Sequence, residues 1–264
     1  MRSSNRKAFS LIELLVVIGI LAVLVGILFP VVGRVRRAAY GASTAQSIST
    51  LQAAIQQYWS TFNGYPFARF GAVGATAYSG PSMTSSESLV VLLQGGIQFN
   101  PGTTYTFNAA DVGRGPVSFN LRNPKRYTPF GGVKHSDGTM NALTETSLYS
   151  DTVVPEFIDS FPEPMPILYA PADTSIATKY AWSTFSAYGT PAPSASTTQF
   201  DQVTPNNTAN AEREYFSDPS SKVTTPSVNF TRYRNADTYV LIAAGPDRKF
   251  GTKDDQTNFG TPGE

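Results

Sequence analysis

The longest apolar stretch of the chain lies near its start, at residues 9–33. Its sequence is FSLIELLVVIGILAVLVGILFPVVG, and its one charged side chain is Glu13. A bilayer core about 30 Å thick is crossed by roughly 20 helical residues, so the stretch is long enough to span it. A carboxylate at the bilayer centre costs about 2.5–3.5 kcal/mol on insertion scales. Glu13 lies nearer the end, where this cost is lower, and its presence there indicates a function.

A helical pattern continues beyond this stretch. Apolar residues recur at a spacing of three and four, as in an amphipathic helix with one packed face. They are Ile48, Leu51, Ile55, Tyr58 and Phe62, with Ala38 and Ala45 extending the stripe.

Signals that end a helix follow at once. Asn63-Gly64 provides a C-cap, and Pro66 prevents continuation. We therefore expect one helix from about Phe9 to about Phe62, roughly 80 Å long. Residues 9–33 form its membrane or assembly half, and residues 34–62 form the spine of a soluble domain that extends to residue 264. Pro30 marks a kink or melting point between the halves.

The later pattern is weaker and mixed. Residues 85–94, SSESLVVLLQ, predict a short capped helix ended by Gly95-Gly96. Strands are predicted at 165–170, 180–185 and most clearly 238–244, the last within a C-terminal strand-and-loop segment at 236–260. Residues 97–149 show no clear period, and 187–227 predict a long exposed insertion. The predicted fold class is α+β, with a long N-terminal helix packed on a small antiparallel sheet domain with long loop insertions.

Composition limits the soluble part. Only 15% of residues are charged, Gly and Pro are abundant, and cysteine is absent, so no disulfide can restrain the domain. An exported domain without disulfides often needs another restraint, and a bound metal is one option. The formal net charge is +1 and becomes about −2 if Arg2, Arg6 and Lys7 are removed. No nucleic-acid surface is expected.

Residues 1–8, MRSSNRKA, form a basic leader in front of the apolar stretch. A basic segment before an apolar run is typical of a secretory signal peptide. Such a peptide needs small residues at a cleavage site after the run, but here Phe29-Pro30-Val31 is followed by arginines. The alternative is an ordinary signal anchor.

The junction at residues 7–13, KAFSLIE, resembles the processing site of type IV prepilins and type II secretion pseudopilins. The resemblance implies a prepilin peptidase that cleaves between Ala8 and Phe9 on the cytoplasmic side, followed by N-methylation of Phe9. Pro30, which becomes residue 22 of the mature chain, matches a position where these helices commonly carry proline. Ala8 departs from the pattern, because the family strongly prefers glycine there.

Physical chemistry gives Glu13 a role of its own. Cleavage creates a positive α-amino group on Phe9, close to the membrane face. In a bundle of such helices, the carboxylate of one chain can pair with the amine of its neighbour, which removes much of the cost of holding either charge in apolar surroundings. The pairing favours ordered assembly, and the resemblance implies the same role for the equivalent glutamate.

An acidic loop follows the predicted strand at 238–244. Its sequence is AGPDRKFGTKDDQTN, and it contains Asp247, Asp254 and Asp255. Calcium takes six to eight oxygen ligands, which carboxylates and carbonyls of one turn can supply, although the spacing does not fit an EF-hand. The alternative is a solvated acidic turn. The loop resembles the calcium loop of major, G-type pseudopilins, which implies these aspartates as ligands, with the backbone carbonyl of Ala244.

Catalytic patterns are weak. His135, Ser136 and Asp137 have the composition of a triad, but adjacent residues point in different directions. The glycine-containing stretch at 71–76 lacks the lysine of a phosphate-binding loop. Without cysteine and with one histidine, zinc is not expected. We expect that the protein is not an enzyme.

The resemblance implies a structural subunit of a pilus-like filament, with a pilin-like fold. A type II secretion pseudopilin that polymerises to drive protein export is preferred over a type IV pilin for adhesion, motility or DNA uptake. A membrane-anchored binding protein or enzyme is the second alternative. The expected location is the inner membrane, crossed once, with the N-terminus cytoplasmic and the domain periplasmic or extracellular. Expected partners are further copies of this chain, other pilins or pseudopilins, the prepilin peptidase and the inner-membrane assembly platform.

Overall fold

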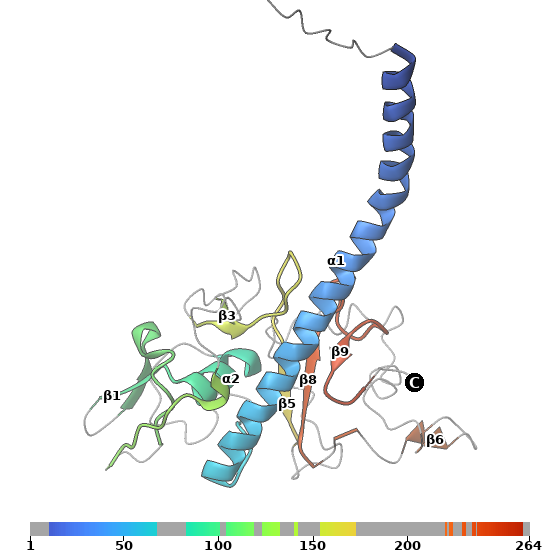
Figure 1. Ribbon diagram of the computed structural model, residues 1–264. Coiled ribbons are helices and arrows are strands. Elements are labelled where there is room, and N and C mark those ends of the chain that lie inside the picture. The colour runs from blue at the N-terminus through green and yellow to red at the C-terminus, as the bar shows by residue number, and fades with distance from the viewer. Residues whose placement is uncertain are drawn as a thin grey trace, which may run out of the picture. The chain divides into compact units, whose positions relative to one another are not determined.

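The computed structural model describes residues 11–67, 83–100, 104–118, 123–132, 140–141, 154–172, 220, 222–223, 229–230, 234–235 and 237–260 (Figure 1). The chain divides into two compact units, Met1–Tyr40 and Gly41–Glu264. Helix α1 (Leu11–Phe62) supplies residues to both. The predicted strand at 180–185 and the sequence around His135 lie outside the described residues.

In the first unit, α1 presents apolar side chains to its surroundings. Every side chain from Leu11 to Phe29 is exposed. Among the described residues, α1 is the one helix long and apolar enough to cross a membrane. The helix continues through Pro30, so the predicted melting there is not observed. A proline removes one backbone hydrogen bond, and the turns on either side keep theirs.

In the second unit, one face of α1 enters the core. Ile48, Leu51, Ile55 and Tyr58 are buried, which confirms most of the predicted stripe. Its extension was wrong, because Ala38 and Ala45 are exposed and the buried position of that turn is Thr44.

The end of α1 is a left-handed turn. Asn63 has φ of 54°, and its N–H donates to the Trp59 carbonyl at 2.7 Å. Asparagine adopts this conformation more readily than most residues, so it closes the helix where the cap was predicted.

Helix α2 (Ser85–Gln94) is buried on every side. Thr84 caps it by accepting from the Glu87 N–H at 3.2 Å, while a Glu87 carboxylate oxygen accepts from the Thr84 N–H at 2.6 Å. This capping box satisfies backbone donors that would otherwise be buried without partners. Gly95 ends the helix, as the sequence predicted.

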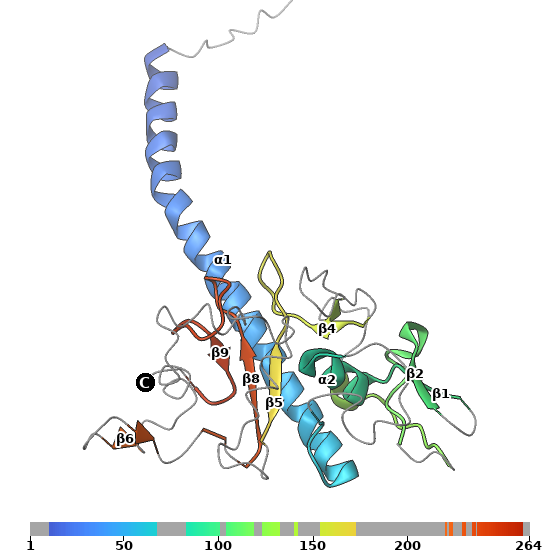
Figure 2. The ribbon, with the colours of Figure 1, turned by 180° about the vertical axis from the view of Figure 1, so that it is seen from behind.

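The central sheet is three-stranded and antiparallel, in the order β5 (Leu168–Pro171), β8 (Tyr239–Ala243) and β9 (Gln256–Thr257). Figure 2 shows it beside the domain half of α1. Alternate residues face opposite sides. Tyr169 and Leu241 join the core that includes α1 and α2, whereas Leu168 and Ile242 join a second cluster that contains Phe250.

Among the described residues, three two-stranded antiparallel sheets accompany the central one. They pair β1 (Ile97–Asn100) with β2 (Thr104–Phe107), β3 (Met140–Asn141) with β4 (Glu156–Phe157), and β6 (Lys222–Val223) with β7 (Asn229–Phe230). Short 3₁₀ turns, η1 (Ala109–Asp111) and η2 (Phe130–Gly132), lie between β2 and β3. The predicted α+β class, a long N-terminal helix with small antiparallel sheets, is confirmed.

Candidate functional site: the N-terminal helix and the C-terminal loop

Glu13 lies in the first turn of α1, on an exposed helix surface. An acid in the first turn is favoured because the helix macrodipole is positive at that end. Ala8 and Phe9 lie outside the described residues, so cleavage and methylation there stay predictions. Pro30 is part of the uninterrupted helix.

The predicted C-terminal site is a loop between β8 and β9. The sheet register returns the chain beside its starting point, since Ala243 pairs with Gln256. The loop needs glycine at its start, because a Cβ on Gly245 would clash with the Asp254 carbonyl oxygen. Phe250 is fully buried against the sheet and anchors the middle of the loop.

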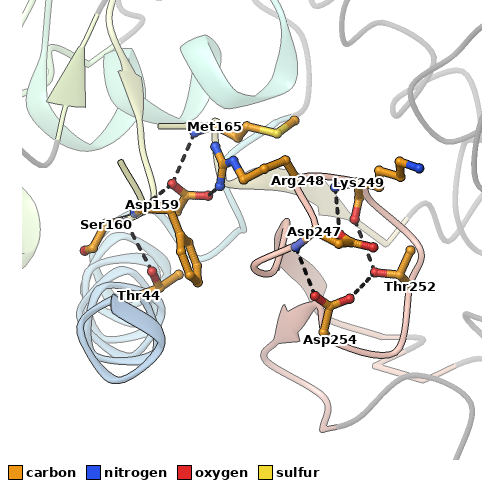
Figure 3. A network of polar contacts seen from close by, with 10 residues as sticks. Thr44, Asp159, Ser160, Met165, Asp247, Arg248, Lys249, Thr252 and Asp254 are labelled. Carbon is orange, nitrogen blue, oxygen red and sulfur yellow. Dashed lines mark hydrogen bonds and ion pairs between the residues drawn. The ribbon is translucent and has the colours of Figure 1, made fainter. Parts of the chain in front are cut away.

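Two of the predicted ligands are linked across this loop (Figure 3). The Asp247 N–H donates to Asp254 Oδ2 at 3.1 Å, and Asp247 Oδ1 accepts from the Lys249 N–H at 2.9 Å. Both aspartates are exposed. Each carboxylate therefore accepts a backbone hydrogen bond and still faces solvent.

Asp255, the third predicted ligand, is buried with 6% of its surface exposed. One of its carboxylate oxygens accepts from the Gly251 N–H, and the other lies 3.2 Å from the Thr252 hydroxyl. That hydroxyl also contacts Asp254 Oδ1. The Thr252 hydroxyl thus lies between the carboxylates of Asp254 and Asp255. Ala244, whose backbone carbonyl is the fourth predicted ligand, is fully buried.

These residues share one loop, but in this structure their carboxylates are not gathered around one point. Within the described part of the chain, no group of three or more acidic or histidine side chains is arranged to hold a metal ion. The carboxylates are instead acceptors for loop hydrogen bonds. Calcium binding therefore stays a prediction.

An ion pair that the sequence did not indicate ties this loop to the rest of the domain. Arg248 Nη1 lies 2.6 Å from Asp159 Oδ2, whose side chain is fully buried. The guanidinium also lies over the Phe161 ring, 5.6 Å from its centroid. Asp159 Oδ1 accepts from the Phe161 and Met165 N–H groups at 3.3 and 3.2 Å.

Burial dominates the electrostatics of this carboxylate. It raises the pKa of Asp159 above its ordinary value, while the hydrogen bond from Arg248 and those from the backbone lower it. The sequence offers no local signal for this pair, because the two residues are 89 positions apart.

The turn at residues 159–161, which contains Asp159, also contacts α1. The Ser160 N–H donates to Thr44 Oγ1 at 3.1 Å (Figure 3). The Ser160 hydroxyl lies 2.8 Å from that of Ser43. Thr44 is completely buried. The turn therefore connects the domain half of α1 with the C-terminal loop.

Comparison with known proteins identifies the N-terminal segment. Residues 3–29 match a family model described as the prokaryotic N-terminal methylation motif. No curated protein and no solved structure matches the chain. The matched segment includes Ala8, Phe9 and Glu13, and its later residues form the exposed apolar turns of α1. The chain therefore carries the methylation motif of pilin- and pseudopilin-type proteins, joined to an α+β domain.

Proposed function

We propose that this protein is a structural subunit of a pilus-like filament, and specifically a type II secretion pseudopilin that polymerises through α1 to drive protein export. The observation that carries the proposal is the methylation motif at residues 3–29, with its acid in the first turn of a long exposed apolar helix. That helix continues without a linker into the folded domain, which favours a filament subunit over a domain tethered by a flexible segment.

In this proposal, the prepilin peptidase removes residues 1–8 at the inner membrane, with the N-terminus cytoplasmic. The new amine of Phe9 pairs with Glu13 of a neighbouring subunit on the assembly platform. Exposed apolar side chains of α1 pack against equivalent helices, of this chain or of other pilins or pseudopilins, as they leave the bilayer. Charge pairing fixes the register, and apolar burial supplies most of the affinity.

A type IV pilin is the second candidate. The long insertion predicted at 187–227 supports it, because it makes the middle of the chain longer than that of compact major pseudopilins. Deletion of the gene separates the two candidates. A secretion pseudopilin predicts accumulation of exported proteins in the periplasm, whereas a type IV pilin predicts loss of surface fibres with normal secretion.

The test of assembly is Glu13→Gln, expressed in competition with wild type. The variant should insert and keep a folded domain, but its share of the filament should fall several-fold, because the amide cannot neutralise a neighbour's amine. Glu163→Gln is the matched control, since Glu163 is exposed in the soluble domain. Glu13→Asp keeps the charge and should recover part of the incorporation. Equal incorporation of Glu13→Gln and wild type would contradict the charge-pairing role.

We also propose a calcium ion at the C-terminal loop, held by Asp247, Asp254 and Asp255 with the Ala244 carbonyl. Three carboxylates in one loop repel one another, and a divalent cation would relieve that repulsion. Oxygen donors of this kind suit calcium. The ion would restrain a C-terminal segment that has no disulfide.

A further inference from the structure

The turns of α1 just after the apolar stretch carry three arginines, Arg34, Arg36 and Arg37. All three side chains are exposed. Within the described part of the chain, none has an ion-pair partner. The filament proposal gives them no role.

Their position along the helix matches a bilayer boundary. The rise from Leu11 to Arg34 is about 34 Å at 1.5 Å per residue, slightly more than a hydrocarbon core of about 30 Å. With Leu11 at the cytoplasmic face, Arg34 reaches the phosphate layer of the opposite face. Arg36 and Arg37 follow within one turn.

The segment also has two distinct faces. At 100° per residue, the three arginines fall within an arc of about 160°. The opposite arc holds Val31, Val32 and Val35, which are 50%, 39% and 60% exposed. The basic and the apolar side chains of this segment therefore lie on opposite faces of the helix.

The arginines also oppose the usual charge bias of membrane proteins. Basic residues normally gather on the cytoplasmic flank of a span. If residues 1–8 are removed, that flank keeps only the amine of Phe9, while three arginines remain on the other side. Such an arrangement calls for a local partner of negative charge.

We propose that Arg34, Arg36 and Arg37 bind the headgroups of anionic phospholipids in the leaflet that faces the soluble domain. Each guanidinium donates to a phosphate oxygen, and the methylene stem of each arginine lies along the neighbouring apolar surface. The contact holds the subunit at a fixed depth before it enters a filament. This inference rests on the membrane placement in the proposed function.

The experiment uses the full chain in vesicles of phosphatidylcholine and phosphatidylglycerol. Spin-labelled versions of each lipid report, by electron paramagnetic resonance, which lipid is immobilised at the protein. Wild type should prefer phosphatidylglycerol, and the preference should fall about twofold in Arg34→Gln/Arg36→Gln/Arg37→Gln. The control Lys125→Gln/Lys249→Gln/Lys253→Gln removes equal charge from exposed positions of the domain and should keep the preference.

The outcomes are distinct. An inserted arginine variant with the wild-type lipid preference, or an equal loss in the control, would overturn the proposal. Unchanged lipid preference with impaired incorporation would instead identify a second copy of the chain as the partner, which also overturns it. Extraction of the wild-type protein from vesicles by alkaline carbonate would contradict the membrane placement itself. The proposal is supported if all three proteins insert fully, the control keeps the wild-type lipid selectivity and the arginine variant has a reduced selectivity.

Discussion

Arg248 is the residue whose surroundings most clearly fix the C-terminal loop. Its φ of 62° is unusual for a side chain other than glycine and costs about 1 kcal/mol. The 2.6 Å contact with buried Asp159 offsets that cost. A carboxylate removed from water needs such a partner, because an unpaired charge in the interior is expensive.

Replacement of this arginine should therefore weaken the fold. Arg248→Met leaves Asp159 buried without its cation and should lower the free energy of unfolding by about 2–4 kcal/mol. Urea denaturation of the protein in detergent measures the change. Asp159→Asn in the Arg248→Met background should restore part of the loss, because the remaining group is neutral. Strictly additive single and double variants would show that the pair is not coupled.

At the scale of elements, the sequence was informative where the signal is local. The predicted helix at 85–94 has the bounds of α2, because its capped start and its end at Gly95-Gly96 are each signalled within one turn. Strand β8 was predicted because a short, continuous apolar run closed by Gly245-Pro246 is typical of a strand buried on both faces. Strands β1 and β2 were missed although IQFN and TYTF each alternate between apolar and polar residues, because each strand is only four residues long.

The cap of α2 offers a quantitative check. Thr84 accepts from the Glu87 N–H and donates to Glu156 Oε1 at 3.1 Å, and all three residues are buried. Thr84→Ala should cost about 1–2 kcal/mol and lower the melting temperature. Thr61→Ala, which removes an exposed hydroxyl bonded to the Gln57 carbonyl, is the matched control and should change stability by under about 0.5 kcal/mol. Equal effects of the two substitutions would contradict the capping role.

At the scale of the whole molecule, the sequence predicted the exposed apolar half of α1 and the buried stripe of its second half. It did not predict the contacts between distant segments that hold the domain together. The apolar half and the buried stripe follow directly from the spacing of side chains. The turn at 159–161 does not, because its contacts with Thr44 and Arg248 join segments 116 and 89 residues apart. Such contacts depend on how the chain folds back, which no local pattern records.

Calcium provides a test at this scale. If the C-terminal loop binds the ion only when folded, calcium at a hundredfold excess over Kd should stabilise the domain by about 2.7 kcal/mol. Chelation should lower the melting temperature and expose the C-terminal segment to protease. Asp254→Ala with Asp255→Ala should reproduce the effect and remove any response to chelator. A solvated acidic turn predicts instead equal stabilisation by magnesium and calcium at matched ionic strength, or none by either.

The central claim is that this chain is processed and assembled as a pilin-type subunit. Its most direct test is mass spectrometry of the N-terminal peptide of the protein isolated from its own cells, in the polymer fraction. The account predicts a chain that begins at N-methylated Phe9, with residues 1–8 absent. An intact Met1, or an N-terminus created by cleavage after Pro30, would contradict it.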